Sequence, residues 1–183
     1  MSLSIPPPAS PAPPDLANAV AVATDAPERP ELWDAAERLA EAHDRPEDVA
    51  LAYVEAVRKE LPRDYALELC QRAYDFVSQW FEDGIGAVPI LLRALEIDTT
   101  ADWAFRRLTM QLTVGSRWEE LLALYDRVIA ATTDAARRVE LYGEAAQIAK
   151  DLAGNADRAI GYLAALARGR ARAAGCYPDP VGA

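Results

Sequence analysis

The stretches EDVALAYVEA (residues 47–56) and EELLALYDRV (residues 119–128) decide the fold. Each places a small or aliphatic residue first, a large residue four positions on, and another small or aliphatic residue three further, as at Val49, Tyr53 and Ala56. This spacing puts the three side chains on one face of an α-helix. The two stretches therefore predict two amphipathic helices in equivalent positions, 72 residues apart.

The same kind of pattern runs through most of the chain as an internal repeat. One series of helices carries the triplets Val49/Tyr53/Ala56, Ala87/Leu91/Ala94, Leu121/Tyr125/Val128 and Ala159/Leu163/Leu166. The helices between them carry Trp33/Ala36/Ala40, Leu67/Cys70/Tyr74, Phe105/Leu108/Leu112 and Val139/Tyr142/Ala146. Spacings of 34 and 38 alternate within each series, so two consecutive spacings add to 72. The chain is therefore predicted to hold two copies of a 72-residue, four-helix unit.

The expected fold is all-α, because β-branched alternation is absent and Gly and Pro fall between the periodic runs. Asp44 and Ser116 are interpreted as caps at helix starts, Ser116 with Glu119 at capping-box spacing. Connections of two to five residues predict antiparallel packing of neighbouring helices. The predicted helices cover residues 31–43, 46–60, 64–81, 86–97, 100–113, 117–131, 134–152 and 155–168.

Both ends of the chain lack this periodicity. Residues 1–30 hold eight of the thirteen prolines and predict a Pro/Ala-rich disordered lead-in, with one short helix over 15–24. Residues 169–183 are predicted to be a flexible tail. The repeat domain is therefore placed at 31–168.

The pattern resembles the tetratricopeptide repeat (TPR) family of helical hairpins. Helix 86–97 and the pair Tyr142–Gly143 match that family best, and Trp33 matches its helix-A tryptophan. The family's helix-A glycine is replaced elsewhere by Glu37, Gln71 and Thr109. The resemblance implies a divergent α-solenoid of four antiparallel hairpins in a right-handed superhelix, with Trp33 in the core.

Charge and composition exclude several classes of protein. The net charge is −10, and residues 1–98 hold 19 acidic and 8 basic side chains. Such a surface is unsuited to nucleic acid and favours a basic partner, although solubility alone also explains it. No apolar run is long enough to span a membrane, and no secretory signal is visible, so a cytoplasmic location is expected. The excess of Ala and Arg over Lys is typical of a bacterial coding sequence.

No catalytic, metal-binding or cofactor-binding constellation is found in the sequence, so we expect a non-enzymatic protein without cofactors. The only histidine, His43, is interpreted as a charge or cap at a helix end. Cys70 lies on an apolar face and is expected to be buried and inert. Cys176 falls in the tail, where it could be a reactive free thiol. However, no neighbouring residue in the sequence would lower the pKa of this thiol.

The TPR resemblance implies a peptide-binding groove lined by polar positions of helix A. The mixture of charged and aromatic types at these positions suits a protein segment. The candidates carried into the prediction are Tyr65, Glu68, Arg72, Trp103, Arg106, Met110, Arg137 and Glu140, with Asp34, Arg38, Glu41, Asp75, Glu144 and Gln147 in the same register.

The leading hypothesis is a scaffold that binds a protein segment. One alternative is a structural fragment of a longer repeat array. Another is an RNA-processing adaptor of the half-a-TPR type, which the negative net charge disfavours. Because the last hairpin has no following helix, self-association through it is also expected.

Overall fold

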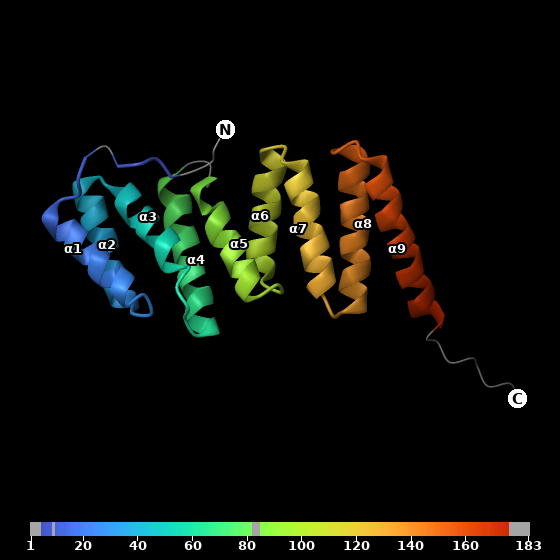
Figure 1. The fold of residues 1–183 in the computed structure, drawn as a ribbon, viewed down its shortest axis with the longest axis horizontal. Helices are drawn as coiled ribbons and strands as arrows, with labels where there is room; N and C mark the ends of the chain where they lie inside the picture. The colour runs from blue at the N-terminus through green and yellow to red at the C-terminus, as the bar shows by residue number, and fades with distance from the viewer. Residues whose placement is uncertain (1–4, 9, 82–84, 176–183) are drawn as a thin grey trace, which may run out of the picture. The chain divides into compact units, whose positions relative to one another are not determined.

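The computed structural model describes residues 5–8, 10–81 and 85–175. Within these ranges the chain is all-helical, as predicted, and contains no β-strand (Figure 1). The elements are α1 (Pro14–Asp25), α2 (Pro30–His43), α3 (Pro46–Ala56), α4 (Arg63–Trp80), the 3₁₀ turn η1 (Ile85–Ala87), α5 (Val88–Ile97), α6 (Asp102–Val114), α7 (Trp118–Ala131), α8 (Ala135–Asp151) and α9 (Ala156–Gly175).

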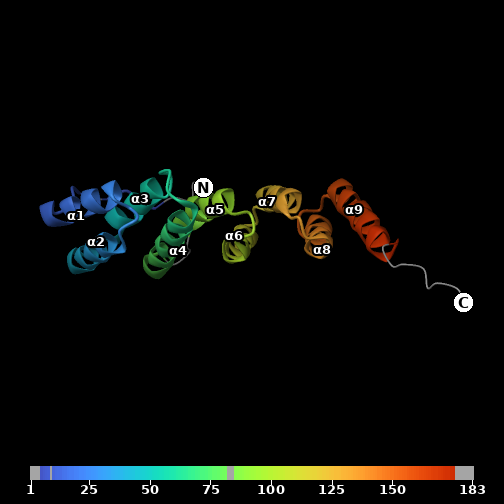
Figure 2. The same ribbon diagram turned by 90° about the horizontal axis from the view of Figure 1, so that it is seen from below.

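The helices form two compact units, Met1–Gln111 and Leu112–Ala183. In the first unit, α1, α3 and α5 make one layer, and α2 and α4 make the other (Figure 2). In the first unit, successive helices therefore alternate between two layers. In the second unit, α8 packs against both α7 and α9, and α9 also contacts α7 through Tyr162 and Asp126.

Two helix ends differ from the predicted ranges. Helix α3 ends at Ala56 because the next residues close tighter turns, with Arg58 N bonded to Glu55 O and Lys59 N to Ala56 O. Helix α9 continues to Gly175 instead of ending at 168. A Cβ at Gly169 would lie 3.0 Å from Val139 Cγ2, so this glycine permits close packing on α8 and does not end the helix. Cys176 and the rest of the predicted tail lie outside the described residues.

Within the lead-in predicted for residues 1–30, the structure describes the helix α1 (Pro14–Asp25). Helix α1 covers the short helix expected at 15–24 and packs against α2 and α3. Its Leu16 and Ala23, two turns apart on one face, are fully buried. Asp15 Oδ2 lies 3.0 Å from His43 Nε2 at the end of α2, where the sequence places His43 as a terminal charge. The side-chain hydrogen bond with His43, followed by a backbone hydrogen bond at Leu16, lowers the pKa of Asp15.

The residues before α1 form a strap within the first unit, defined here as residues 5–8 and 10–13. Arg45 donates hydrogen bonds to Ser10 Oγ at 3.1 Å, to Ser10 O at 2.7 Å and to Pro11 O at 3.3 Å. Ile5 is only 7% exposed, and a Cβ at Gly86 would come within 2.4 Å of its Cγ1. The absence of a side chain at Gly86 therefore makes room for Ile5.

The core of the first unit is built around stacked aromatic rings. Trp33 is fully buried, as predicted, and stacks on Tyr53 with ring centroids 4.0 Å apart. Its Nε1 donates to Pro27 O at 3.1 Å, so the buried indole N–H is satisfied. Cys70 is also buried, as expected, and burial raises its pKa to about 12.

Two turns 72 residues apart share one backbone conformation. Asp44 (φ 53°) and Ser116 (φ 52°) are the non-glycine residues with positive φ in the described chain. After Asp44, Arg45 N bonds to Ala40 O at 2.8 Å, and after Ser116, Arg117 N bonds to Leu112 O at 2.9 Å. Each turn therefore ends the preceding helix in a left-handed cap.

This geometry overturns the prediction that Asp44 and Ser116 cap the helices that follow them. The N-cap positions belong instead to Arg45 and Arg117, and neither makes a side-chain cap hydrogen bond. Arg45 pairs with Asp48 at 2.8 Å, and Arg117 pairs in the same i, i+3 spacing with Glu120. At the starts of α3 and α7, an i, i+3 ion pair therefore occurs where a hydroxyl or carboxylate cap was predicted.

Candidate functional site

A groove runs between α2 and α4 in the first unit. It consists of two adjoining hollows of about 630 and 380 Å³, which share Glu37, Phe76 and Gln79. We call it the α2/α4 groove and define it by its lining residues: Pro30, Asp34, Glu37, Arg38 and Glu41 from α2, and Glu68, Gln71, Arg72, Asp75, Phe76, Gln79 and Trp80 from α4.

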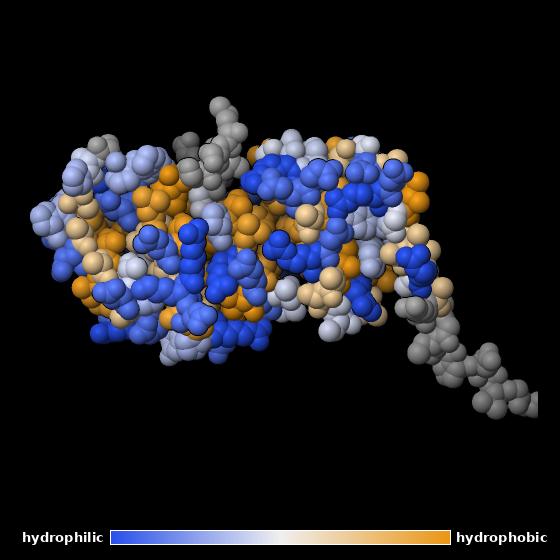
Figure 3. Space-filling model, in the orientation of Figure 1, coloured by the Kyte–Doolittle hydropathy of each residue, from blue (hydrophilic) through white to orange (hydrophobic). Residues whose placement is uncertain are grey.

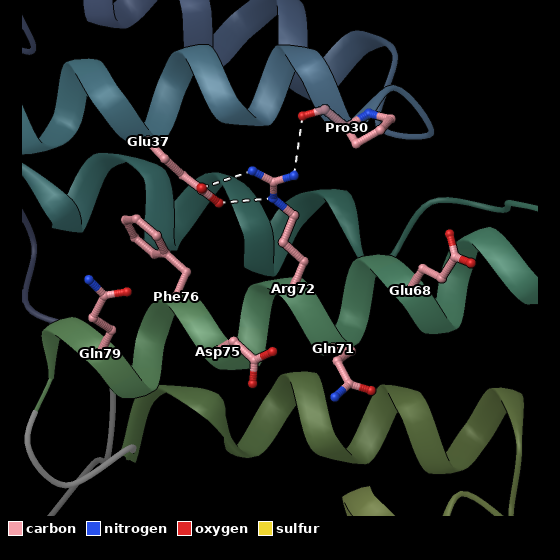
Figure 4. Close-up of a pocket in the computed structure, with 8 residues that line it drawn as sticks. All are labelled: Pro30, Glu37, Glu68, Gln71, Arg72, Asp75, Phe76 and Gln79. Carbon is pink, nitrogen blue, oxygen red and sulfur yellow. Dashed lines mark hydrogen bonds and ion pairs between the residues drawn. The ribbon is translucent and has the colours of Figure 1, made fainter.

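The centre of the groove is tied together by Arg72 of α4. Figure 4 shows its guanidinium reaching toward α2, where it meets Glu37 and the carbonyl of Pro30. Nε lies 3.0 Å from Glu37 Oε1, and Nη2 lies 2.8 Å from Glu37 Oε2 and 2.6 Å from Asp34 Oδ1. Nε also donates to Tyr53 Oη of α3 at 2.8 Å. One side chain therefore joins three helices.

This network fixes the protonation of its members. Burial alone would lower the pKa of Arg72, but hydrogen bonds to Glu37 and Asp34 raise it above its usual value. Burial, followed by the hydrogen bond to Glu37, raises the pKa of Tyr53. Arg72 is therefore a permanent cation whose donors are directed at neighbouring helices and away from solvent. It shapes the groove and has little capacity left for a partner.

Three carboxylates of the groove do not take part in this network of ion pairs and hydrogen bonds. Glu41, Glu68 and Asp75 are exposed, and none makes an ion pair within the part of the chain that the structure describes. Arg38 Nε donates a hydrogen bond to the backbone carbonyl of Asp34, one turn earlier in the same helix, at 3.1 Å. The groove thus presents more free negative than positive charge.

The groove also offers apolar and amide surface. The rings of Phe76 and Trp80 lie 6.3 Å apart, with Phe76 buried and Trp80 half-buried. Gln71 and Gln79 line the larger hollow, and their amides can donate and accept hydrogen bonds. Carboxylates, amides and aromatic surface together suit a basic polypeptide better than a small apolar molecule.

The sequence-predicted residues of α4 lie at or beside this groove. Glu68 and Arg72 line it, and Tyr65, 50% exposed, borders a smaller hollow of about 130 Å³ that also contacts both. The candidates on α6 lie apart from it. Trp103 packs against Tyr74, with ring centroids 6.4 Å apart.

The other α6 candidates point to solvent. Arg106 pairs with Asp102 of its own helix at 2.6 Å and is 76% exposed. Met110 is 59% exposed. Neither lines the α2/α4 groove.

Arg137 and Glu140 belong to the second unit and are described by themselves. Arg137 pairs with Glu140 at 3.0 Å and lies 3.8 Å from Glu144. Tyr125 Oη donates to Glu144 at 2.9 Å, and burial together with Glu144 raises the pKa of this tyrosine. Tyr125 and Glu144 line a hollow of about 310 Å³.

Sequence reasoning did not assign six of the lining residues to the groove: Pro30, Glu37, Gln71, Phe76, Gln79 and Trp80. Glu37 carried a signal, because it stands where the resembled family has a glycine, and a carboxylate there needs a cationic partner. Phe76 and Gln79 carried none, since both fit an ordinary helix pattern.

Within the described residues, no group of three or more His, Cys, Asp or Glu side chains could hold a metal ion. In the same residues, no helix combines the length and apolar character needed to cross a membrane.

No protein-family model matches the chain, and no curated protein matches it. Among solved structures, the chain is similar to the crystal structure of BtubC (BKLC) from P. vanneervenii, with 15% sequence identity, 92% of each chain covered and a TM-score of 0.40. Values this low define neither a family nor a function for the chain.

Proposed function

We propose that the protein is a non-enzymatic scaffold that binds a basic protein segment in the α2/α4 groove. The observation that carries the proposal is the groove itself: two adjoining hollows whose free charges are mainly carboxylates and whose wall holds Phe76 and Trp80. Complementary charge would speed and orient the encounter, and the aromatic wall would supply the apolar contact area.

The placement of the free acids defines the kind of segment. Glu68 and Asp75 lie seven residues apart on α4, which corresponds to about 10 Å along the helix axis. Two Lys or Arg side chains match this distance when they are three residues apart in an extended segment, or seven apart in a helix. A large apolar residue on the same segment would pack on Trp80.

We further propose that the chain forms a TPR-like α-solenoid of four hairpins, built from two copies of a 72-residue unit. The matching left-handed turns at Asp44 and Ser116 support the duplication, as do the matching ion pairs after them. A third support is the 19-residue separation of both Tyr53–Arg72 and Tyr125–Glu144. A cytoplasmic location remains a prediction from the sequence.

The binding proposal is tested by selecting peptides from a random library on the full chain and measuring their affinities by fluorescence anisotropy. We expect enriched peptides with two basic residues at the spacing above and an adjacent apolar one. The double variant Glu68→Gln/Asp75→Asn should weaken their binding about tenfold at low salt, and added salt should weaken wild-type binding.

The matched control is Glu55→Gln, which removes an exposed carboxylate of α3 in the same unit, outside the groove. Its affinity should equal that of the wild type. Enriched peptides without basic residues, or equal losses in the groove variant and the control, would refute the proposal.

A further inference from the structure

Helix α9 carries an apolar stripe that nothing covers in the described residues. Ile160 is 64% exposed and Leu163 is 49% exposed. Exposed alanines extend the stripe in both directions at helical spacing, so that it consists of Ala156, Ile160, Leu163, Ala164, Ala167 and Ala171. In Figure 3, apolar side chains come to the surface over the N-terminal half of this helix. The stripe is about 24 Å long.

The opposite face of α9 is already occupied. Tyr162 donates to Asp126 of α7 at 2.7 Å, and Arg158 reaches Glu119 of α7 at 3.2 Å. Gly169 lies against Val139 of α8. The stripe therefore faces away from its own unit.

One edge of the stripe carries two opposite charges. Asp157 and Arg168 are exposed and lie eleven residues apart, which places them within about 20° of each other around the helix. Their own helix offers no opposite charge at i±3 or i±4, and neither makes an ion pair within the described ranges.

We propose that α9 is the contact face of a two-fold symmetric, antiparallel dimer of this chain. In such a pair, residues on the same edge of the two helices face each other at equal distances from the axis. An axis near residues 162–163 sets Asp157 of each copy opposite Arg168 of the other. Both charges are then paired, twice per dimer, by the same register that buries Ile160 and Leu163.

The sizes of the stripe residues fit this arrangement. Ile160 and Leu163 supply the large side chains, and Ala164, Ala167 and the exposed Gly161 allow the helix axes to approach closely. This inference rests on α9 alone and is independent of the proposed peptide groove.

The first test is the oligomeric state of the full chain, measured by analytical ultracentrifugation across a concentration series. We expect a dimer whose Kd rises at least about tenfold in Leu163→Glu. The matched control is Leu152→Glu, since Leu152 in the same unit is also 49% exposed but lies outside the stripe. A monomer at all concentrations, or equal effects of the two variants, would overturn the proposal and leave the stripe to another partner.

The second test examines the charged pair. Asp157→Arg and Arg168→Asp each set like charges opposite one another twice, and each should weaken the dimer about tenfold. The double variant should recover the wild-type Kd to within about threefold. Failure of the double variant to recover would exclude this register.

The third test fixes the direction of the helices. In a Cys176→Ser background, Leu163→Cys should cross-link between copies through a short bifunctional thiol reagent. Ala156→Cys should not, because the two copies of position 156 are separated by about 20 Å in the antiparallel register. Cross-linking at both positions would indicate a parallel pair and refute the proposal.

Discussion

The phenol oxygen of Tyr53 accepts a hydrogen bond from Arg72 Nε at 2.8 Å. The same oxygen donates to Glu37, so the hydroxyl of a fully buried ring lies between an anion and a cation from two other helices. Removing the hydroxyl takes away two hydrogen bonds to charged groups and leaves the ring stacking on Trp33 unchanged. The tyrosine therefore fixes the positions of Glu37 and Arg72, two residues that line the groove.

We expect Tyr53→Phe to lower the free energy of unfolding by about 1–3 kcal/mol. Tyr125→Phe, which removes the hydrogen bond to Glu144, should cost about 0.5–1.5 kcal/mol. Urea denaturation followed by circular dichroism measures both. Tyr65→Phe, at a half-exposed tyrosine, serves as the control and should change nothing. Equal midpoints for all three variants would contradict the role given to the buried hydroxyls.

Arg72→Ala should destabilise the first unit by about 2–4 kcal/mol, because Glu37 would lose its cationic partner while remaining half-buried. Arg106→Ala removes a solvent-exposed i, i+4 pair and should cost less than about 0.5 kcal/mol. Thermal unfolding compares the two. If Arg72→Ala melts with the wild type and only weakens peptide binding, Arg72 contacts the partner directly.

Alkaline pH should destabilise the fold through Cys70. Burial raises the pKa of this thiol to about 12, compared with about 8.5 in an unfolded chain. Between these values the unfolded chain releases a proton that the folded chain keeps, so stability falls as pH rises, by up to about 1.4 kcal/mol per pH unit. Below that window the effect is absent.

Urea midpoints of the wild type and Cys70→Ala, measured from about pH 7.5 to about pH 10.5, isolate this effect because the two proteins share their tyrosines. The wild type should lose stability more steeply. Parallel curves would show that Cys70 ionises in the folded state.

Gly86→Ala should displace the strap, since the added Cβ would lie 2.4 Å from Ile5 Cγ1. The change is followed by the NMR signal of the Ile5 δ-methyl group and by proteolysis of residues 5–13. Ile5→Ala is the matched variant, because it removes the obstacle itself. In that background Gly86→Ala should cost less than it does in the wild type. Equal costs in both backgrounds would mean that the strap does not pack on Gly86 in solution.

Much of the helical layout could be predicted from the sequence because its signals are local. The triplet around Tyr53 and its copy around Tyr125 follow helical spacing, and prolines mark the starts of α2 and α3. The backbone conformation at the helix ends was harder to predict. Asp44 and Ser116 have side chains that suit either a helix start or a left-handed helix end, and only the backbone distinguishes the two.

Long-range partners could not be predicted. The register predicts Arg72 on the groove side of α4, but it does not reveal that Glu37 and Asp34 on α2 accept hydrogen bonds from it. Ile5 is likewise a single apolar residue among prolines, with no periodicity to mark it as buried. Its contact depends on the space above Gly86, which only the folded chain creates.

The paired left-handed turns also leave room for engineering. Both sites hold residues with a Cβ in a conformation that glycine adopts without steric penalty, and serine tolerates it less well than aspartate. Heat tolerance could therefore be raised at positions 44 and 116 without altering the groove or the α9 stripe. Engineering this chain as a binding platform would therefore begin with glycine substitutions at these two turns, which natural selection has not optimised for thermal stability.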